Sequence, residues 1–214
     1  MAHWYTADPH FGHEAIIRHC NRPYRTADEM DATLMRTLRA TVGRHDDLWI
    51  VGDLAFGPRA KDAAWLKRLF AQLPGARRHL VVGNHDGPAT RALPWDTVAP
   101  MAEIKDEGTR LVLCHYPLLT WSGARRGALH LFGHVHGNWR GSRGAVNVGV
   151  DCWGYRPVRL PEIAARAAAL PPHPLWDEVE PGAARALSSS GAGNRHKGFG
   201  GPGGPLSARQ QTPV

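Results

Sequence analysis

Cysteine is scarce in this sequence, and long hydrophobic runs are absent. The three cysteines, Cys20, Cys114 and Cys152, are widely scattered, which argues against a disulfide framework or a CxxC metal site and favours buried free thiols. No apolar run approaches the roughly 20 residues that cross a bilayer, and the first ten residues lack the charged start and apolar middle of a signal peptide. We therefore expect a cytoplasmic protein with no membrane partner.

Several catalytic motifs are also missing. The sequence contains no G-x-S-x-G nucleophile elbow, no CxxxxxR phosphatase loop and no Walker GxxxxGK loop. It has no block of five or six like charges that would mark a nucleic-acid-binding arm. The net charge is nevertheless +7, and almost all of this excess lies in residues 1–170. A positive protein favours an anionic substrate, although arginines on a solvated face explain much of the same excess.

The pattern of short apolar runs predicts strands at 3–7, 47–53, 78–84, 109–115, 128–134, 145–151 and 156–160. Amphipathic spacing predicts helices at 13–20, 28–42, 60–73 and 161–170, the second of them capped by Thr26 or Asp28. Strands and helices alternate early in the chain, whereas the later strands follow one another through short turns. This order favours an α/β sandwich with mixed sheets.

The composition changes after the fourth predicted helix. Residues 171–214 become rich in Gly, Ser and Pro and hold little that a core could bury. We therefore expect one folded domain over residues 1–170 and a disordered tail over residues 171–214.

Residue types that bind metals lie at the ends of five of the predicted strands. They are Asp8 and His10, Asp53, Asn84, His115, and His134 with His136. In an extended segment, residues two apart point the same way, so each D-x-H or H-x-H pair can reach one ion. Each piece also has a plainer interpretation: His115 suits a hydrogen-bonded core histidine, Asp53 a turn or helix cap, and GNHDG a polar turn in which Gly83 and Gly87 bend the backbone. The recurrence at five strand ends favours a metal centre.

In chain order these motifs read D-x-H, GD, GNHD, H and GHxH, which resembles the calcineurin-like metallophosphoesterases over about residues 3–160. The phrases HFGHEAIIRHCNRPY and NVGVDCWGYRPV are similar to a compact bacterial and phage branch of that superfamily. The resemblance implies a four-layer αββα sandwich of two mixed β-sheets flanked by helices. It also implies a phosphoesterase with two divalent metal ions per chain.

The resemblance assigns the ligands to two ions. Asp8, His10 and His136 would hold one ion, Asn84, His115 and His134 the other, and Asp53 would bridge them. Mixed carboxylate, amide and imidazole ligands suit Mn, Fe, Zn, Ni or Co. With two carboxylates and a bridging hydroxide, the centre keeps a net positive charge and attracts phosphate, so we expect the hydroxide to attack the ester in line.

His85 and Asp86 are not needed as ligands in this scheme. We expect His85 to face the phosphate, where it would stabilise the transition state or protonate the leaving oxygen. Asp86 would accept a hydrogen bond from His85 and fix its tautomer. His13 and Arg22 follow the first metal motif and are candidate substrate contacts. A helix-start residue is an equally good interpretation of His13, and a surface guanidinium or a salt bridge of Arg22.

Other functions remain open at this point. An amidohydrolase barrel also uses H-x-H at a strand end, but it needs roughly 250 residues. A catalytically weak metal-binding scaffold and a nucleic-acid-binding protein on the same fold are further alternatives. The intact ligand series favours an enzyme, and the lack of a cap domain favours a phosphodiester over a phosphomonoester. Its substrate is then a phosphate ester, with a nucleotide or a nucleic-acid end as a candidate.

Overall fold

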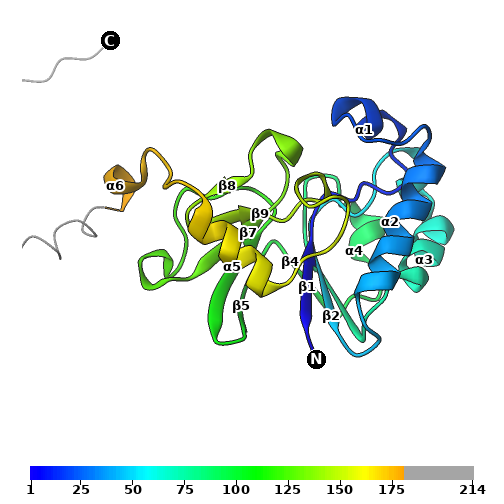
Figure 1. Ribbon diagram of the computed structural model, residues 1–214. Helices are drawn as coiled ribbons and strands as arrows, with labels where there is room; N and C mark the ends of the chain where they lie inside the picture. Colours follow the sequence, from blue (N-terminus) through cyan, green and yellow to red (C-terminus); the bar gives the residue numbers. More distant parts are fainter. Residues whose placement is uncertain (181–214) are drawn as a thin grey trace, which may run out of the picture. The chain divides into compact units, whose positions relative to one another are not determined.

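The computed structural model, which describes residues 1–180, contains two β-sheets flanked by helices (Figure 1). The first sheet has the strand order β1–β2–β3–β4 and is parallel throughout. Its strands are β1 His3–Thr6, β2 Asp47–Val51, β3 Arg77–Val81 and β4 Thr97–Ala99. Each of the first three strands is followed by a connection that returns to the other end of the sheet, as parallel pairing requires.

The second sheet has the order β5–β6–β7–β9–β8, with β6, β7 and β9 parallel to one another and an antiparallel strand at each edge. Its strands are β5 Met101–Asp106, β6 Thr109–Cys114, β7 Leu129–Phe132, β8 Gly141–Ser142 and β9 Ala145–Asn147. The predicted sandwich of two sheets with flanking helices is thus confirmed, and only the second sheet is mixed in direction.

The helices are α1 Glu14–His19, α2 Ala27–Thr41, α3 Ala63–Gln72, α4 Pro88–Arg91, α5 Leu160–Ala169 and α6 Trp176–Val179. Four short 3₁₀ turns join them: η1 Pro58–Lys61, η2 Ala124–Arg126, η3 His136–Asn138 and η4 Val150–Cys152. Thr26 caps α2, because its Oγ1 accepts the backbone N–H of Glu29 at 3.2 Å. None of the helices within residues 1–180 is long and apolar enough to cross a bilayer.

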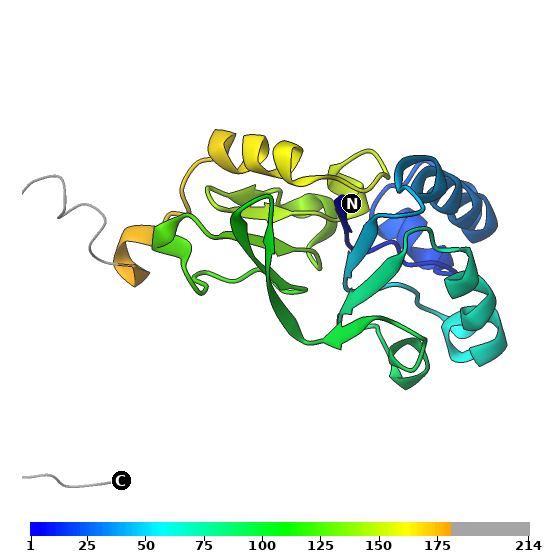
Figure 2. The ribbon, with the colours of Figure 1, turned by 90° about the horizontal axis from the view of Figure 1, so that it is seen from below.

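Alternation along the strands builds separate cores on the two faces of each sheet. In β2, Leu48 and Ile50 pack into the cluster that includes α2 and α3, whereas Trp49 and Val51 pack into the cluster shared by both sheets and α5. Figure 2 shows α2 and α3 alongside the first sheet and α5, in yellow, alongside the second. A third cluster, around Phe132, covers the remaining face of the second sheet.

The structure differs from the predicted elements in two respects. Residues 156–160 form no strand: Val158 makes only an isolated bridge to Tyr5, since Pro157 lacks an N–H and α5 begins at Leu160. Strands β4, β5 and β8 were not predicted. The exposed positions of β5 alternate with partly buried ones, as expected of an edge strand, and its charged residues obscure that pattern in the sequence.

The predicted tail begins inside the described part of the chain. Residues 171–180 are described and include α6, whose Trp176 ring lies 5.6 Å from that of Trp121. The rest of the predicted tail, residues 181–214, lies outside the described residues, so the disorder predicted there stays a prediction.

Candidate metal centre

The parallel strands bring the predicted ligands to one edge of the sandwich. Asp8 and His10 follow β1, Asp53 follows β2 and Asn84 follows β3, and these three strands are neighbours in the first sheet. His115 follows β6, and His134 and His136 follow β7, which are neighbours in the second sheet. The carboxyl ends of adjacent parallel strands are the usual position of a site in open α/β sheets.

Left-handed backbone conformations mark these strand ends. Asp8, His10, Asp53, His134 and His136 all have φ between +49° and +69°. They make up five of the eight non-glycine residues with positive φ in the described residues. Each such conformation costs on the order of 1–3 kcal/mol and persists only where the surrounding structure enforces it, which is common at functional sites. Because none of these five residues is a glycine, the sequence gives no signal of their left-handed backbone.

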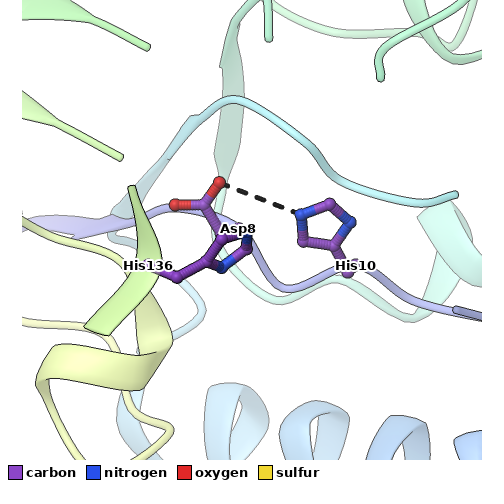
Figure 3. A group of neighbouring side chains, drawn as sticks. All are labelled: Asp8, His10 and His136. Carbon is purple, nitrogen blue, oxygen red and sulfur yellow. Dashed lines mark ion pairs between the residues drawn. The ribbon is translucent and has the colours of Figure 1, made fainter. Parts of the chain in front are cut away.

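The first group of candidate ligands consists of Asp8, His10 and His136, whose ligand atoms all lie within 4.8 Å of one another (Figure 3). Nε2 of His10 is 4.0 Å from Oδ1 of Asp8 and 3.6 Å from Oδ2 of Asp53. This nitrogen is buried and has no hydrogen-bond partner. An unpaired buried nitrogen that faces two carboxylates is costly unless a cation lies between them. The residues therefore fit a metal ion.

The second group surrounds the amide oxygen of Asn84. This oxygen lies 3.0 Å from Nε2 of His115 and 2.9 Å from Nδ1 of His134. Nδ1 of His115 lies 2.9 Å from the carbonyl oxygen of Val51 and must donate to it, because a carbonyl can only accept. In the neutral ring, Nε2 of His115 is then an acceptor that faces other acceptors. This arrangement also fits a cation.

Asp53 lies between the two groups. Its Oδ2 is 3.6 Å from Nε2 of His10 and 3.3 Å from Nε2 of His115, and the ligand atoms of Asp8, Asp53 and His115 also lie within 4.8 Å of one another. Burial tends to raise the pKa of Asp53, but the hydrogen bond and the charge of His115 lower it overall. A carboxylate in this position can serve ions on both sides.

The ionisable side chains at the candidate centre shift one another's pKa values. Burial raises the pKa of Asp8 to about 7, against the opposing effects of His115 and His136. Burial lowers the pKa of His115, yet its hydrogen bond to Asp53 and the charge of Asp8 raise it overall. The site thus favours positive charge at Nε2 of His115, which a proton or a metal ion can supply.

His85 lies beside the first group, half-buried, with its ring centroid 5.4 Å from that of His10 and 4.1 Å from that of Phe56. Its backbone N–H donates to Oδ1 of Asp53 at 2.8 Å. Its ring is therefore held at the edge of the metal centre by the same carboxylate that joins the two groups. The role predicted for this ring, facing the phosphate, stays a prediction.

The structure corrects the role expected of Asp86. Its carboxylate accepts the backbone N–H groups of Gly83, Asp53 and Leu54 at 2.8, 2.8 and 3.0 Å. In the described part of the chain, none of the hydrogen bonds of Asp86 reaches the ring of His85. Asp86 therefore fixes the backbone of two strand ends and not the tautomer of His85, because its hydrogen bonds go to amide donors on those segments. Burial raises its pKa to about 6, against the lowering effect of these amides.

The two candidate substrate contacts have different outcomes. Nδ1 of His13 lies 3.3 Å from Nδ1 of His10, so His13 is at the site, and burial lowers its pKa to about 4. Arg22 is only 4% exposed. Its guanidinium donates to both oxygens of Asp151 and to the carbonyl oxygens of Asp8 and Pro9. With its donors used inside the protein, Arg22 makes a buried salt bridge and is not a substrate contact.

Asp151 is the residue that the sequence reasoning missed. Its Oδ2 lies 3.0 Å from Nδ1 of His136, whose other ring nitrogen is left for a ligand. Burial lowers the pKa of His136, but the hydrogen bond to Asp151 and nearby groups raise it to about 10. Cys20 also lies within 4.8 Å of these two residues. The only sequence signal was an acidic residue after a Gly-rich strand end, GVD, like the GD of Asp53.

Comparison with solved structures supports the fold. The chain is similar to a protein of unknown function from Aquifex aeolicus, with a TM-score of 0.62 and 24% identity over 77% of this chain and 98% of that one. It also has a weaker similarity, with a TM-score of 0.41 and 20% identity, to Yfce, a phosphoesterase from E. coli, over 70% of this chain and 78% of that one. No model of a known protein family matches the chain.

Comparison with curated proteins gives closer sequence relatives. The chain is 29% identical to the Gene 66 protein of Mycobacterium phage L5 over 75% of its length and 91% of the relative. It is 28% identical to an uncharacterized protein of Methanocaldococcus jannaschii over 72% of its length and 84% of the relative. It is 30% identical to the Gene 66 protein of Mycobacterium phage D29 over 70% of its length and 88% of the relative. The chain therefore belongs to the family of the mycobacteriophage Gene 66 proteins.

Proposed function

We propose that this protein is a phosphoesterase of the calcineurin-like metallophosphoesterase superfamily, which hydrolyses a phosphodiester or phosphomonoester with two divalent metal ions. One observation carries the proposal. Nε2 of His10 is buried without a partner and faces the carboxylates of Asp8 and Asp53. A protein that only needed a stable core would pair this nitrogen. Its neighbours at the strand ends are the residue types that a dinuclear site uses.

We assign the residues to two ions, and the distances between them support this division. Asp8, His10 and His136 form one ligand set, and Asn84, His115 and His134 form the other. Mn, Fe, Zn, Ni and Co suit this donor set. Ions bound there would supply Lewis-acid activation of water and of the phosphoryl oxygens. Asn84 contributes a neutral oxygen, which preserves positive charge for an anionic substrate.

The chain itself supplies the proton and the positioning. The half-buried ring of His85 lies next to His10 and is free to donate a proton to the oxygen that leaves phosphorus. Asp53 holds the backbone N–H of His85, and Asp86 holds that of Asp53, so the His85 loop is fixed relative to the ligands. His13, at 3.3 Å from His10, is placed to contact the substrate.

The surroundings of the site favour an extended anionic substrate. Asn84 is exposed, and Tyr116, beside His134, is 46% exposed, so the centre is open on that side. The basic balance of residues 1–170 attracts anions. We therefore favour a phosphodiester, with a nucleotide or a nucleic-acid end as the candidate partner.

The test is reconstitution of the metal-free protein with Mn²⁺. We expect about two Mn²⁺ per chain by elemental analysis and hydrolysis of bis-p-nitrophenyl phosphate in preference to p-nitrophenyl phosphate. The Asp53→Asn variant should bind less Mn²⁺ and lose activity, whereas His45→Ala, on an exposed loop away from the centre, should match the wild type. Two bound ions without activity on either ester would instead favour a metal-binding scaffold or a nucleic-acid-binding protein.

A further inference from the structure

A groove of about 480 Å³ opens beside His85, on the side of that ring where Phe56 lies. We call it the His85 groove. Its walls are formed by residues between Phe56 and Lys61 on one segment and between His85 and Ala89 on the other. The volume lies within the range of small-molecule sites, roughly 300–1,000 Å³. The lining is apolar except for the side chains of His85 and Lys61.

Gly87 keeps this groove open. Its backbone has φ −70° and ψ 178°, an extended conformation that any residue adopts, so the turn does not require glycine. A Cβ atom built at Gly87 would have no heavy atom within 4 Å. Neither backbone strain nor crowding explains the glycine expected to bend this turn. What a side chain would do here is occupy the groove.

Phe56 presents an aromatic surface in the same place. It is 37% exposed, although it follows the buried Leu54 and Ala55. Its ring lies 4.1 Å from the ring of His85 and 4.6 Å from that of His13, centroid to centroid. An exposed large aromatic next to a phosphate-binding centre is a platform for stacking, which contributes about 1–3 kcal/mol per nucleobase. The two imidazoles hold the ring in position.

Lys61 gives the groove a single positive charge. It is exposed, and within residues 1–180 no ion pair holds its ammonium group. An ammonium at the wall of an apolar groove can donate to sugar or phosphate oxygens while the Phe56 ring carries the stacking. Apart from Lys61 and His85, no polar side chain lines the groove. The groove therefore has no group placed to distinguish one base from another by hydrogen bonds to its edge.

We propose that the His85 groove binds the nucleoside leaving group of the phosphate ester, with the base stacked on Phe56 and the sugar oxygen directed at His85. The proposal rests on the proposed function and names its substrate class. In the reaction, the oxygen of water forms a bond to phosphorus and the bond from phosphorus to the sugar oxygen breaks. His85 gives its proton to that sugar oxygen, which leaves as an alcohol, and the proton that water loses returns to His85. The leaving side therefore lies toward Phe56.

The test compares two probes on the Mn²⁺-reconstituted protein by titration calorimetry. Inorganic phosphate occupies only the centre, whereas the phosphonate analogue of thymidine 5′-monophosphate, in which a non-hydrolysable carbon–phosphorus bond replaces the ester bond to the sugar, also reaches the groove. We expect wild-type protein to bind the nucleotide at least about tenfold more tightly than phosphate. Gly87→Leu should remove that advantage and leave phosphate affinity within about twofold. Ala64→Leu, on the exposed side of α3, adds the same side chain away from the groove and should leave both affinities unchanged.

Phe56→Leu keeps an apolar side chain but removes the ring, so it tests the same groove from the opposite wall. It should also bring nucleotide affinity down to that of phosphate. Equal affinity of the wild type for both probes would overturn the groove assignment, and so would an unaltered ratio of nucleotide to phosphate affinity in both variants. Phosphate binding would still support the proposed function in either case. If the wild type with two ions loaded bound neither probe, this result would contradict the proposed function itself.

Discussion

Asp53 and Asp86 each hold the backbone of the loop that carries the other. Oδ2 of Asp86 accepts the backbone N–H of Asp53 at 2.8 Å, and Oδ1 of Asp53 accepts the backbone N–H of His85, next to Asp86, at 2.8 Å. These bonds join the ends of β2 and β3 at the metal centre. Asp86 is therefore a positioning residue for the candidate ligand Asp53 as well as for the segment that carries His85.

Replacing Asp86 with Asn should destabilise the protein. The carboxylate accepts three backbone N–H groups, whereas the carboxamide has one acceptor oxygen and turns an NH₂ group toward buried donors. We expect the free energy of unfolding to fall by about 2 kcal/mol, as for a buried donor left unpaired. Urea unfolding of the metal-free protein measures this. If Asp86 acted only by orienting His85, Asp86→Asn would have the same free energy of unfolding as the wild type. Adding Asp86→Asn to the His85→Ala variant would then also leave the free energy of unfolding of that variant unchanged.

His85→Ala should separate the proton donor from the metal ligands. The variant should keep the Mn²⁺ content of the wild type, because no candidate ligand is changed. Its turnover should fall about a hundredfold or more on an alkyl phosphate ester, whose leaving oxygen needs a proton, and much less on a p-nitrophenyl ester. Steady-state rates on the two esters give the comparison. An equal loss on both esters, or no loss on either, contradicts the role of His85 as the acid.

The convergence of the candidate ligands could be predicted because it depends on strand ends. Parallel strands place their carboxyl ends at one edge, so D-x-H after β1 and GNHD after β3 had to lie near each other once the strands were recognised. The partner of His136 could not be predicted in this way. Asp151 contacts His136 from 15 residues further along the chain and is also held by Arg22, 129 residues away, and contacts over such separations leave no local pattern.

Local backbone geometry was equally hidden from sequence reasoning. Positive φ at Asp8, His10 and Asp53 is enforced by the fold, and the residues that adopt it are not glycines. Conversely, the glycines flanking NHD were both expected to bend the backbone, and neither has positive φ. Gly83 is required because Asp53 packs against it, and Gly87 leaves space. Only the surrounding atoms distinguish the two.

These glycines give a matched pair of substitutions. A Cβ atom at Gly83 would lie 2.3 Å from Oδ1 of Asp53 and 2.7 Å from its backbone nitrogen, so Gly83→Ala must displace the strand end. We expect a loss of about 3 kcal/mol in the free energy of unfolding, at the upper end for overpacking. Gly87→Ala meets no atom within 4 Å and should stay within about 0.5 kcal/mol of the wild type. Equal stability of the two variants would contradict the packing around Asp53.

Asp151→Asn should weaken metal binding at a distance from the ion. The carboxylate accepts from Nδ1 of His136, and loss of such a partner typically lowers metal affinity 10- to 100-fold, here about 30-fold as a midpoint. Calorimetric titration of metal-free protein with Mn²⁺ measures the change. Arg22→Lys is the control for general loosening, because it disrupts the fork to Asp151 and the bonds to the carbonyl oxygens of Asp8 and Pro9 but leaves the contact between Asp151 and His136 in place. Equal loss of Mn²⁺ affinity in both variants would show that general destabilisation is responsible.

His130 should make the stability of the protein depend on pH below neutrality. The ring is fully buried, with Nδ1 donating to the carbonyl oxygen of Val112 at 2.9 Å and Nε2 accepting the backbone N–H of Leu118 at 3.0 Å. Both nitrogens are satisfied only in the neutral form. Burial lowers the pKa from 6.5 to about 4, although the bond to Val112 opposes this shift.

The sign follows from which state binds the proton. Between pH 6.5 and about 4, the unfolded chain protonates His130 and the folded protein does not. The contribution of the neutral ring is therefore fully present above pH 6.5 and declines as pH falls, by up to about 1.4 kcal/mol per pH unit and roughly 3 kcal/mol in total. His130→Gln cannot titrate in this range. Urea unfolding of the wild type and of His130→Gln from pH 7 to pH 4 measures this contribution. As pH falls, the stability of the wild type relative to His130→Gln should decrease by that amount. Parallel curves for the two proteins would show that His130 is protonated in the folded protein as readily as in the unfolded chain.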